Sequence, residues 1–405
     1  MRSSTPRLAG VALVTIAGLV LVGCSSKAPS ASSTGTSGAL TIQPLVQIDK
    51  AGKEVKSQAG GTAANPAGDG KATCASTTTI AMAGALTGAN AALGINIANG
   101  VKLAIKQHND ANKDCQVQFK GFDTEGDPAK APAVATQIIN DANVIGLIGP
   151  AFSGETKATG AAFHDAGLLS LTASATNPAL TTNGWNNFFR GLANDAVQGP
   201  SVAAYMVNTA GFKKVCVVKD DSDYGVGLAQ QITTGLGSAA DASCALSVKT
   251  GDKDFSSAVQ SIKSAAPDAI FYSGYYAEAA PFVAQLRTGG VTATFVSADG
   301  TNDPQFVKQA GSASKGALLS CPCGPAPADF EKAYEAAFNV SSGVYSVEAY
   351  DLATIVLKAI DGGAKDRASV VNFVKGYSGD GLARHYQWDS TGELSSALIW
   401  IYQVK

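Results

Sequence analysis

The chain has few of the residues on which most catalytic and metal sites depend. Only 3 of its 405 residues are histidines, and His108, His164 and His385 fall on different predicted elements. They form neither an H-E-x-x-H motif nor an evident Ser–His–Asp set. The sequence also lacks a phosphate-binding P-loop, and the dinucleotide motif that begins at Gly225 is incomplete because Gln230 occupies its third glycine position. These absences predict a protein without enzymatic activity, cofactor or metal.

An excess of charge of one sign is also absent. The sequence has 30 Lys and Arg against 32 Asp and Glu, a formal net charge of −2. A net charge so close to zero gives no reason to expect nucleic acid or an anionic membrane surface as a partner. Apolar residues make up 45% and glycines number 44, which suits a globular α/β protein with many tight turns. The length predicts two lobes and a tether, since an average domain has about 150 residues.

The N-terminus lacks an apolar run long enough to cross a membrane. Arg2 and Arg7 precede an apolar run at residues 8–21, which is shorter than the roughly 20 residues of a spanning helix. The run ends in Leu21-Val22-Gly23-Cys24, the pattern of a lipid-attachment box. We therefore predict that residues 1–23 are a lipoprotein signal peptide and that Cys24 carries the lipid, on the outer face of the bacterial cell membrane. The alternative is an ordinary secretory signal with a chance cysteine.

A segment with little apolar bulk follows the predicted lipid box. Residues 25–39 are mostly Ser, Thr, Gly and Ala, which cannot offset the entropy lost on ordering. Within residues 40–55, Thr41, Ile42, Val46 and Ile48 hint at a short hairpin, and residues 57–71 return to Gly, Ala and Asn. We expect residues 24–74 to form the lipidated cysteine and a flexible, poorly ordered arm.

Six cysteines remain once Cys24 is assigned to lipid, and an even number outside the cytosol indicates possible disulfides. Cys74 lies just before the predicted strand at 79–83, and Cys115 opens the next one at 116–122. Cys216 and Cys244 stand in a similar relation to the predicted strands at 215–218 and 245–248. If each pair of strands is adjacent in a parallel sheet, both cysteine pairs come within bridging distance.

The remaining two cysteines are separated by a single proline. Cys321 and Cys323 could close only a strained small ring, so a bridge between them stays open. Metal binding is the weaker alternative, because no third cysteine or histidine lies nearby.

From residue 77 onward, apolar strands alternate with helical segments, which is typical of βαβ units and a parallel sheet. We predict the first strands at residues 79–83, 116–122, 144–148 and 168–172, with helices at 95–109, 128–141 and 154–165. The alternation then restarts, with strands at 215–218, 245–248, 269–272 and 294–297 and helices at 196–209, 225–236, 255–265 and 278–287. The predicted fold class is α/β, with two doubly wound Rossmann-like lobes and ligands at the carboxyl ends of the strands.

Polar residues gather in the turns after two strands of the first lobe. Phe152 and Ser153 follow residues 144–148, and Ser174-Ala175-Thr176 follows residues 168–172. Hydroxyls and free backbone N–H groups at helix starts form a site for an anion such as a carboxylate. Ser153 and Thr176 could instead serve only as helix N-caps.

The second lobe presents different chemistry after its strands. Tyr224 follows the strand at 215–218, Tyr275 and Tyr276 follow 269–272, and Asp299 follows 294–297. A carboxylate flanked by aromatic rings suits an ammonium group. With the anion site of the first lobe, this predicts a zwitterionic ligand held in a cleft between the two lobes. Asp299 could otherwise be a turn residue before Gly300. In an extended segment only one of the two adjacent tyrosines can face the cleft, and we favour Tyr275.

These loops resemble those of a known family in their order along the chain. The shared marks are Gly84-Ala85-Leu86-Thr87-Gly88, Asp123-x-x-x-Asp127-Pro128, Ser174-Ala175-Thr176-Asn177-Pro178, Arg190, Gln198-Gly199-Pro200, Asp223-Tyr224-Gly225, Lys253-Asp254-Phe255, Gly274-Tyr275-Tyr276 and Asp389-x-x-Gly392-Glu393. From Thr77 to the C-terminus the chain resembles the branched-chain amino acid binding proteins, the receptors of ABC importers with the type I periplasmic-binding fold.

The resemblance implies a role for each candidate residue. Ser153, the main chain near Ala175 and Thr176 would hold the ligand carboxylate and part of its ammonium. Asp299 would neutralise the ammonium, and Tyr224 with Tyr275 or Tyr276 would close over the ligand. Phe152, Ser174 and Leu93 complete the predicted set of ligand-binding residues. A family member has Glu in place of Asp299 and an aromatic residue in place of Leu93, and both departures bear on which ligand is bound.

The resemblance also implies the organisation and partners of the protein. Lobe 1 would comprise residues 75–190 and 322–378, and lobe 2 residues 191–321 and 379–405, with hinge strands near 189–192, 317–321 and 376–384. A monomer would trap a branched-chain or related small amino acid and deliver it to an ABC permease in the cell membrane. Two alternatives remain. The same fold could bind an amide, urea or aromatic acid, or the protein could be a ligand sensor for a signalling partner.

Overall fold

The computed structural model describes residues 39–56, 64–395 and 398–405. The predicted signal peptide at residues 1–23, the lipid site Cys24 and residues 25–38 of the predicted tether lie outside these ranges. Among the residues that are described, no helix is long and apolar enough to cross a bilayer.

The first sheet has five parallel strands in the order β4-β3-β5-β6-β7. They are β3 (Thr79–Gly84), β4 (Gln118–Asp123), β5 (Val144–Ile148), β6 (Leu169–Thr172) and β7 (Phe188–Arg190). The four strands predicted for this part of the chain are confirmed, with small shifts at their ends. The additional strand β7 begins just before the segment that we predicted as a hinge.

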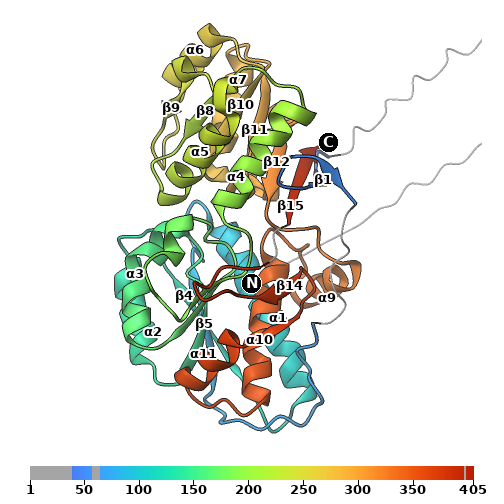
Figure 1. The fold of residues 1–405 in the computed structure, drawn as a ribbon. Helices are drawn as coiled ribbons and strands as arrows, with labels where there is room; N and C mark the ends of the chain where they lie inside the picture. Colours follow the sequence, from blue (N-terminus) through green and yellow to red (C-terminus); the bar gives the residue numbers. More distant parts are fainter. Residues whose placement is uncertain (1–38, 57–63, 396–397) are drawn as a thin grey trace, which may run out of the picture. The chain divides into compact units, whose positions relative to one another are not determined.

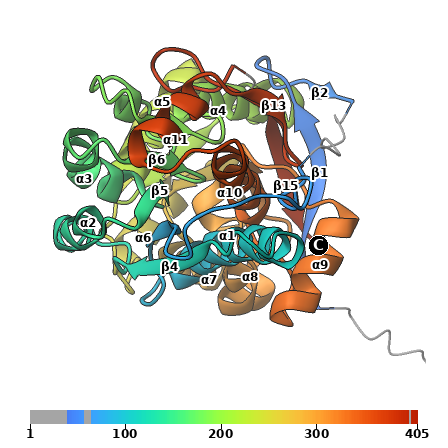
Figure 2. The ribbon, with the colours of Figure 1, turned by 90° about the horizontal axis from the view of Figure 1, so that it is seen from below.

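Helices cover both faces of the first sheet. They are α1 (Ala91–Ala111), α2 (Ala131–Asn140), α3 (Ser153–Asp165), α10 (Ser346–Asp361) and α11 (Arg367–Lys375). Ile80 and Met82 of β3 belong to the hydrophobic cluster that includes α1 and α10, whereas Ala81 and Ala83 belong to the one that includes α2 and α3. A strand buried on both faces needs a continuous apolar sequence, which is why these strands could be predicted from the sequence. Figure 2 shows α1 and α10 side by side.

The second sheet has eight strands in the order β2-β1-β15-β12-β11-β10-β8-β9. Its parallel part contains β8 (Val215–Lys219), β9 (Leu246–Ser247), β10 (Ala269–Ser273), β11 (Thr294–Ser297) and β12 (Leu318–Cys321). The intervening helices are α4 (Asp195–Ala204), α5 (Asp223–Leu236), α6 (Ser256–Ala265), α7 (Tyr276–Thr288) and α8 (Pro304–Ala310), and α9 (Ala328–Phe338) follows β12. These elements confirm the two doubly wound α/β units expected from the sequence.

Residues 42–48, in the middle of the predicted arm, form a strand of this sheet. β1 (Ile42–Ile48) pairs antiparallel with β15 (Ile399–Val404) and with β2 (Glu54–Val55), as Figure 1 shows for β1 and β15. The hint of a hairpin within residues 40–55 is confirmed by the pairing of β1 with β2, but the expectation that residues 42–48 are poorly ordered is wrong. The physical reason is that β15 would otherwise present an unpaired strand edge, which β1 covers.

After β12 the chain returns to the first sheet and then comes back, as expected. α10 packs against α1, and β15 lies between β12 and β1. The boundary that we placed after residue 378 is too early, however. Asp351 of α10 accepts hydrogen bonds of 2.8 Å from the backbone N–H groups of Leu382 and Ala383, and Glu348 of α10 pairs with Arg384. Residues 379–387 therefore stay with α10.

These residues include a small hairpin of β13 (Ser378–Asp380) and β14 (His385–Gln387). It overturns one expectation from the sequence. His385 does belong to a Ser–His–Asp set, because the hairpin brings it beside Ser378 and Asp380. Pairing between two strands depends on their register, which spacing alone does not reveal.

Three cysteine pairs form disulfides in the structure. Cys74 pairs with Cys115 and Cys216 with Cys244, at Cα–Cα distances of 4.6 and 5.2 Å. Both pairs were predicted from the expected adjacency of β3 with β4 and of β8 with β9. Cys321 and Cys323 are also bridged, which resolves the choice that the sequence left open.

Candidate ligand-binding site

A small, partly enclosed cavity, with a free volume of about 10 Å³, lies beyond the carboxyl ends of strands from both sheets. It is lined by Leu93, Ala151, Phe152, Ser153, Ser174, Tyr224, Tyr275, Asp299 and Tyr345. The structure thus brings together all the residues predicted to bind ligand except Ala175 and Thr176. The latter two are buried beside the cavity without lining it.

The turns after β5 and β6 supply hydroxyl groups to one side of the cavity. Ser153 is the first residue of α3, and its Oγ accepts a hydrogen bond of 3.2 Å from the backbone N–H of Asn177. The hydroxyl of Ser174 donates to the carbonyl of Ala151 over 2.5 Å. Ser153 is therefore engaged with the neighbouring turn and does not occupy the N-cap position of its own helix, which is Phe152.

A buried arginine holds the turn that contains Ala175 and Thr176. Arg190, at the end of β7, donates to the carbonyl oxygens of Ala175 and Asn177 and forms an ion pair of 3.0 Å with Glu393. Burial would raise the pKa of Glu393, but Arg190 and further hydrogen bonds lower it below its ordinary value. The backbone N–H of Ala175 donates to the Thr172 hydroxyl over 2.9 Å, so it already has a partner in this state.

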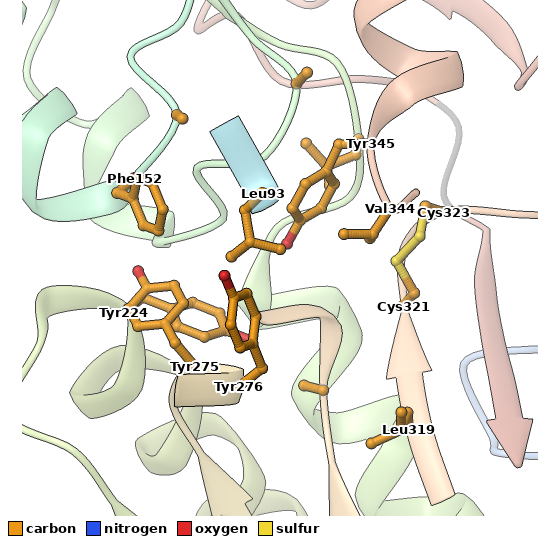
Figure 3. Close-up of a cluster of buried hydrophobic side chains, with 14 of the residues drawn as sticks. Leu93, Phe152, Tyr224, Tyr275, Tyr276, Leu319, Cys321, Cys323, Val344 and Tyr345 are labelled. Atoms are coloured by element: carbon orange, nitrogen blue, oxygen red, sulfur yellow. A yellow bond between two sulfur atoms is a disulfide. The ribbon is translucent and has the colours of Figure 1, made fainter. Parts of the chain in front are cut away.

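Aromatic rings form much of the opposite wall. The ring of Tyr275 lies 5.0 Å from that of Phe152 in an edge-to-face arrangement and 5.2 Å from that of Tyr224. Figure 3 shows the rings of Phe152, Tyr224 and Tyr275 near Leu93. Tyr276 is not part of the lining, because its hydroxyl accepts the backbone N–H of Ala92 at the start of α1. The structure thus places Tyr275 in the cavity wall, the position that we favoured for it.

Asp299 is the acidic group of the cavity. It follows β11 and is buried, so it is not an exposed turn residue. Its Oδ1 accepts hydrogen bonds from Gln198 (2.8 Å) and Tyr224 (3.1 Å), and its Oδ2 accepts one from Tyr345 (2.7 Å). Burial raises the pKa of Asp299, although the hydrogen bonds from Tyr345 and Gln198 act in the opposite direction.

Tyr345 is the main lining residue that the sequence analysis missed. It precedes α10 with a left-handed backbone (φ 71°), and its ring enters the cavity from the returning C-terminal segment. No predicted strand ends just before it, so the rule that ligands lie beyond strand ends could not find it. Ala151, between β5 and Phe152, was also missed.

A second buried carboxylate lies close to Asp299. Within the described part of the chain, no hydrogen bond of normal geometry reaches the side-chain oxygens of Asp195, although the Thr176 hydroxyl is close enough to lower the pKa of that carboxyl. Burial, and then the charge of Asp299, raise the pKa of Asp195 to about 8. In the sequence, Asp195 is only the residue before a predicted helix, and nothing there indicates this buried environment.

Taken together, the cavity presents hydroxyl groups on one side and a carboxylate with aromatic rings on the other. This arrangement can bind a small molecule that carries both charges, because each charge needs a buried partner. The fold and the position of the cavity are those of the type I periplasmic-binding class, with ligand sites beyond the carboxyl ends of parallel strands.

Comparison with known proteins agrees with this classification. A family model described as periplasmic binding protein matches residues 77–405, so the chain belongs to that family. It is 28% identical over 340 residues to the leucine-, isoleucine-, valine-, threonine- and alanine-binding protein of Pseudomonas aeruginosa, covering 81% of this chain and 90% of that protein. It is 29% identical to the leucine-specific-binding protein of Salmonella typhimurium, covering 80% of this chain and 90% of that protein.

A solved structure is similar over the same region. It is the branched-chain amino acid transporter substrate-binding protein of Streptococcus pneumoniae in complex with isoleucine, with a TM-score of 0.74 and 27% identity. The match covers 81% of this chain and 99% of that structure.

Proposed function

We propose that this protein is the extracytoplasmic, lipid-anchored substrate-binding receptor of an ABC importer. In this proposal it traps a branched-chain or related small amino acid between its two lobes, in the cavity around Asp299. The observation that carries the proposal is the buried carboxylate of Asp299 at a wall shared with Tyr224 and Tyr275. The family match and the amino acids for which the relatives are named support the same class of ligand.

The ammonium group of the ligand would be the partner of Asp299. Transfer of an unpaired charge from water into a protein interior costs many kcal/mol, so both ends of a zwitterion must be matched. Charge-assisted hydrogen bonds contribute roughly 1.5–3 kcal/mol each. A handful of them therefore supports micromolar binding, about −8 kcal/mol, after the cost of association.

The carboxylate of the ligand would lie on the opposite side, near Ser153 and Ser174. Ser153 begins α3, a helix of 13 residues whose first N–H groups lack helical acceptors. The N-terminal end of a helix favours an anion for this reason and because of its dipole. Thr176, whose hydroxyl lies beside the buried Asp195, is a further donor if the turn shifts when ligand binds.

The side chain of the ligand would contact the apolar part of the lining. Leu93, Ala151 and Phe152 line this part of the cavity. Leu93 stands where a family member has an aromatic residue and leaves more room than a ring would. An aliphatic side chain is therefore favoured over a charged one.

A ligand without an ammonium group is the second candidate. It is favoured by one observation, which is that Asp299 already accepts three hydrogen bonds from protein groups. An amide, urea or aromatic acid would leave these bonds intact, whereas an amino acid must add to them or displace one.

The anchor and the permease complete the proposal. Support for the anchor comes from the Leu21-Val22-Gly23-Cys24 box alone. Metabolic labelling with a fatty-acid analogue should mark the wild-type protein and leave the Cys24→Ala variant unmarked. Loss of amino acid uptake on gene deletion would favour transport, whereas normal uptake with a lost response to ligand would favour the sensor alternative.

The ligand itself can be identified directly. Native mass spectrometry of the purified receptor should reveal a retained amino acid, and calorimetry with leucine, isoleucine, valine, threonine and alanine should give micromolar affinity for at least one. Binding of only amides, urea or aromatic acids would overturn the amino-acid assignment while keeping the receptor class.

A further inference from the structure

An exposed hairpin outside the ligand cavity carries a serine, a histidine and an aspartate. The histidine ring is hydrogen-bonded to the serine on one side and to the aspartate on the other. The hairpin consists of β13 and β14, whose register pairs Asp380 with His385 and Ser378 with Gln387. Side chains two residues apart on a strand share a face, so Ser378 and Asp380 lie on the same face as His385. Gly379 and Tyr386 occupy the opposite face, where the Tyr386 side chain is buried.

The distances match those expected of a nucleophile, a base and an orienting carboxylate. The Oγ of Ser378 lies 3.2 Å from Nε2 of His385, and Nδ1 of the same ring lies 2.6 Å from Oδ1 of Asp380. The carboxylate therefore holds the ring with Nε2 turned toward the serine. This is the connectivity in which a neutral imidazole removes a proton from a hydroxyl group.

The backbone of the hairpin also directs a donor outward near Ser378. The N–H of Gly381 donates to the carbonyl of Arg384 over 2.8 Å, which makes 381 and 384 a hydrogen-bonded pair. Such pairs alternate along an antiparallel ladder, so residues 380 and 378 direct their N–H groups away from β14. The outward carbonyl of Gln387, which accepts from the N–H of Ser395 over 3.0 Å, fits the same alternation.

We propose that Ser378 is an activated nucleophile that accepts an acyl group from a small activated ester. Its Oγ attacks the ester carbonyl carbon while its proton passes to Nε2 of His385, and the outward N–H of Ser378 donates to the developing oxyanion. Collapse of the intermediate breaks the bond to the leaving oxygen, which takes the proton from His385. Water activated by the same imidazole then cleaves the acyl-serine and restores the hydroxyl group.

The exposure of the site limits the substrate class. The side chains of His385 and Asp380 are 43% and 58% exposed, so no protein wall excludes water around them. Electrostatic stabilisation of a transition state is weaker in such a setting than in a closed site. The acyl group must therefore be short and its leaving group good, as in an aryl ester.

The chain offers a matched internal comparison. Ser256 is also exposed and its hydroxyl bonds to a carboxylate, that of Asp254, but the contact involves no imidazole. Exposure and a carboxylate neighbour alone would make Ser256 and Ser378 equally reactive. Activation by His385 would make Ser378 the faster of the two.

The test is acetylation of the full chain by p-nitrophenyl acetate, followed by peptide mass spectrometry. We expect Ser378 to be acetylated at least about tenfold faster than Ser256, since general-base assistance contributes about 10²–10⁴-fold in enclosed sites. His385→Gln should lower the rate at Ser378 to that of Ser256, and Asp380→Asn should lower it severalfold. Equal rates at the two serines, or a rate unchanged by His385→Gln in a variant with unchanged melting temperature, would overturn the proposal. Ser378→Ala should abolish the corresponding p-nitrophenol release.

Discussion

The hydroxyl of Tyr345 donates a hydrogen bond of 2.7 Å to Oδ2 of Asp299. The two residues are 46 positions apart, and both are buried. Tyr345 comes from the segment that returns to the first sheet, whereas Asp299 follows a strand of the second sheet. This bond therefore joins the two halves of the cavity across their boundary.

Removing that bond should destabilise the protein more than removing a bond to a neutral acceptor, because Asp299 is charged. We expect Tyr345→Phe to lower the free energy of unfolding by about 1.5–3 kcal/mol, the range for hydrogen bonds to charged groups. Tyr350→Phe is the matched control, because the Tyr350 hydroxyl donates to the neutral Oε1 of Gln107 over 2.6 Å. That loss should be about 0.5–1.5 kcal/mol. Urea denaturation checks both values, and equal losses would contradict a charged Asp299.

Asp195 should make stability fall as the pH rises. Its folded pKa of about 8 exceeds the value of about 3.9 for an unperturbed aspartate, so the folded state holds a proton that the unfolded state releases. This contribution is fully present below about pH 4 and is lost as the pH rises toward about 8. In Asp195→Asn the side chain stays neutral throughout.

Melting temperatures of the wild type and Asp195→Asn between pH 5 and pH 8 test this prediction, with the variant gaining relative to the wild type as the pH increases. The difference between the two proteins is the readout, because Glu155 and Asp351 also have a pKa raised to about 7 by burial. Parallel curves for the two proteins would show that Asp195 is not the titrating group.

Arg190 should be far more important for stability than a surface cation. Arg190→Gln removes the partner of Glu393 and the donors to the carbonyls of Ala175 and Asn177, and it should cost about 3–5 kcal/mol. Lys157→Gln is the control, because the Lys157–Asp223 pair is mostly exposed and should contribute less than about 1 kcal/mol. Chemical denaturation measures the free energy of unfolding of the two variants. Similar decreases in the two would refute the role given to Arg190.

The sequence was most informative where structure is local. The strand Val144–Ile148 and the helix that begins at Ser153 could be predicted because a buried parallel strand has a continuous apolar sequence and a turn after it. The disulfides of Cys74 and Cys216 followed from the expected adjacency of strands. All of these depend on neighbours in one repeating βα pattern.

Features that depend on distant segments could not be predicted in this way. β1 is a strand only because β15, at the other end of the chain, has an edge to cover. Tyr345 reaches Asp299 through the packing of α10, and His385 meets Ser378 through a hairpin register. Each of these contacts requires a tertiary arrangement that composition and spacing do not encode.

The most direct test of the central claim is calorimetry of the wild type and Asp299→Asn with leucine and with its des-amino analogue 4-methylpentanoate. The asparagine keeps the shape of the side chain and removes its charge. We predict that the variant binds leucine more weakly by about 2–5 kcal/mol, because the ammonium loses its charged partner, and that its affinity for the analogue is unchanged. Equal affinity of the two proteins for leucine would contradict the assignment of Asp299 as the ammonium partner.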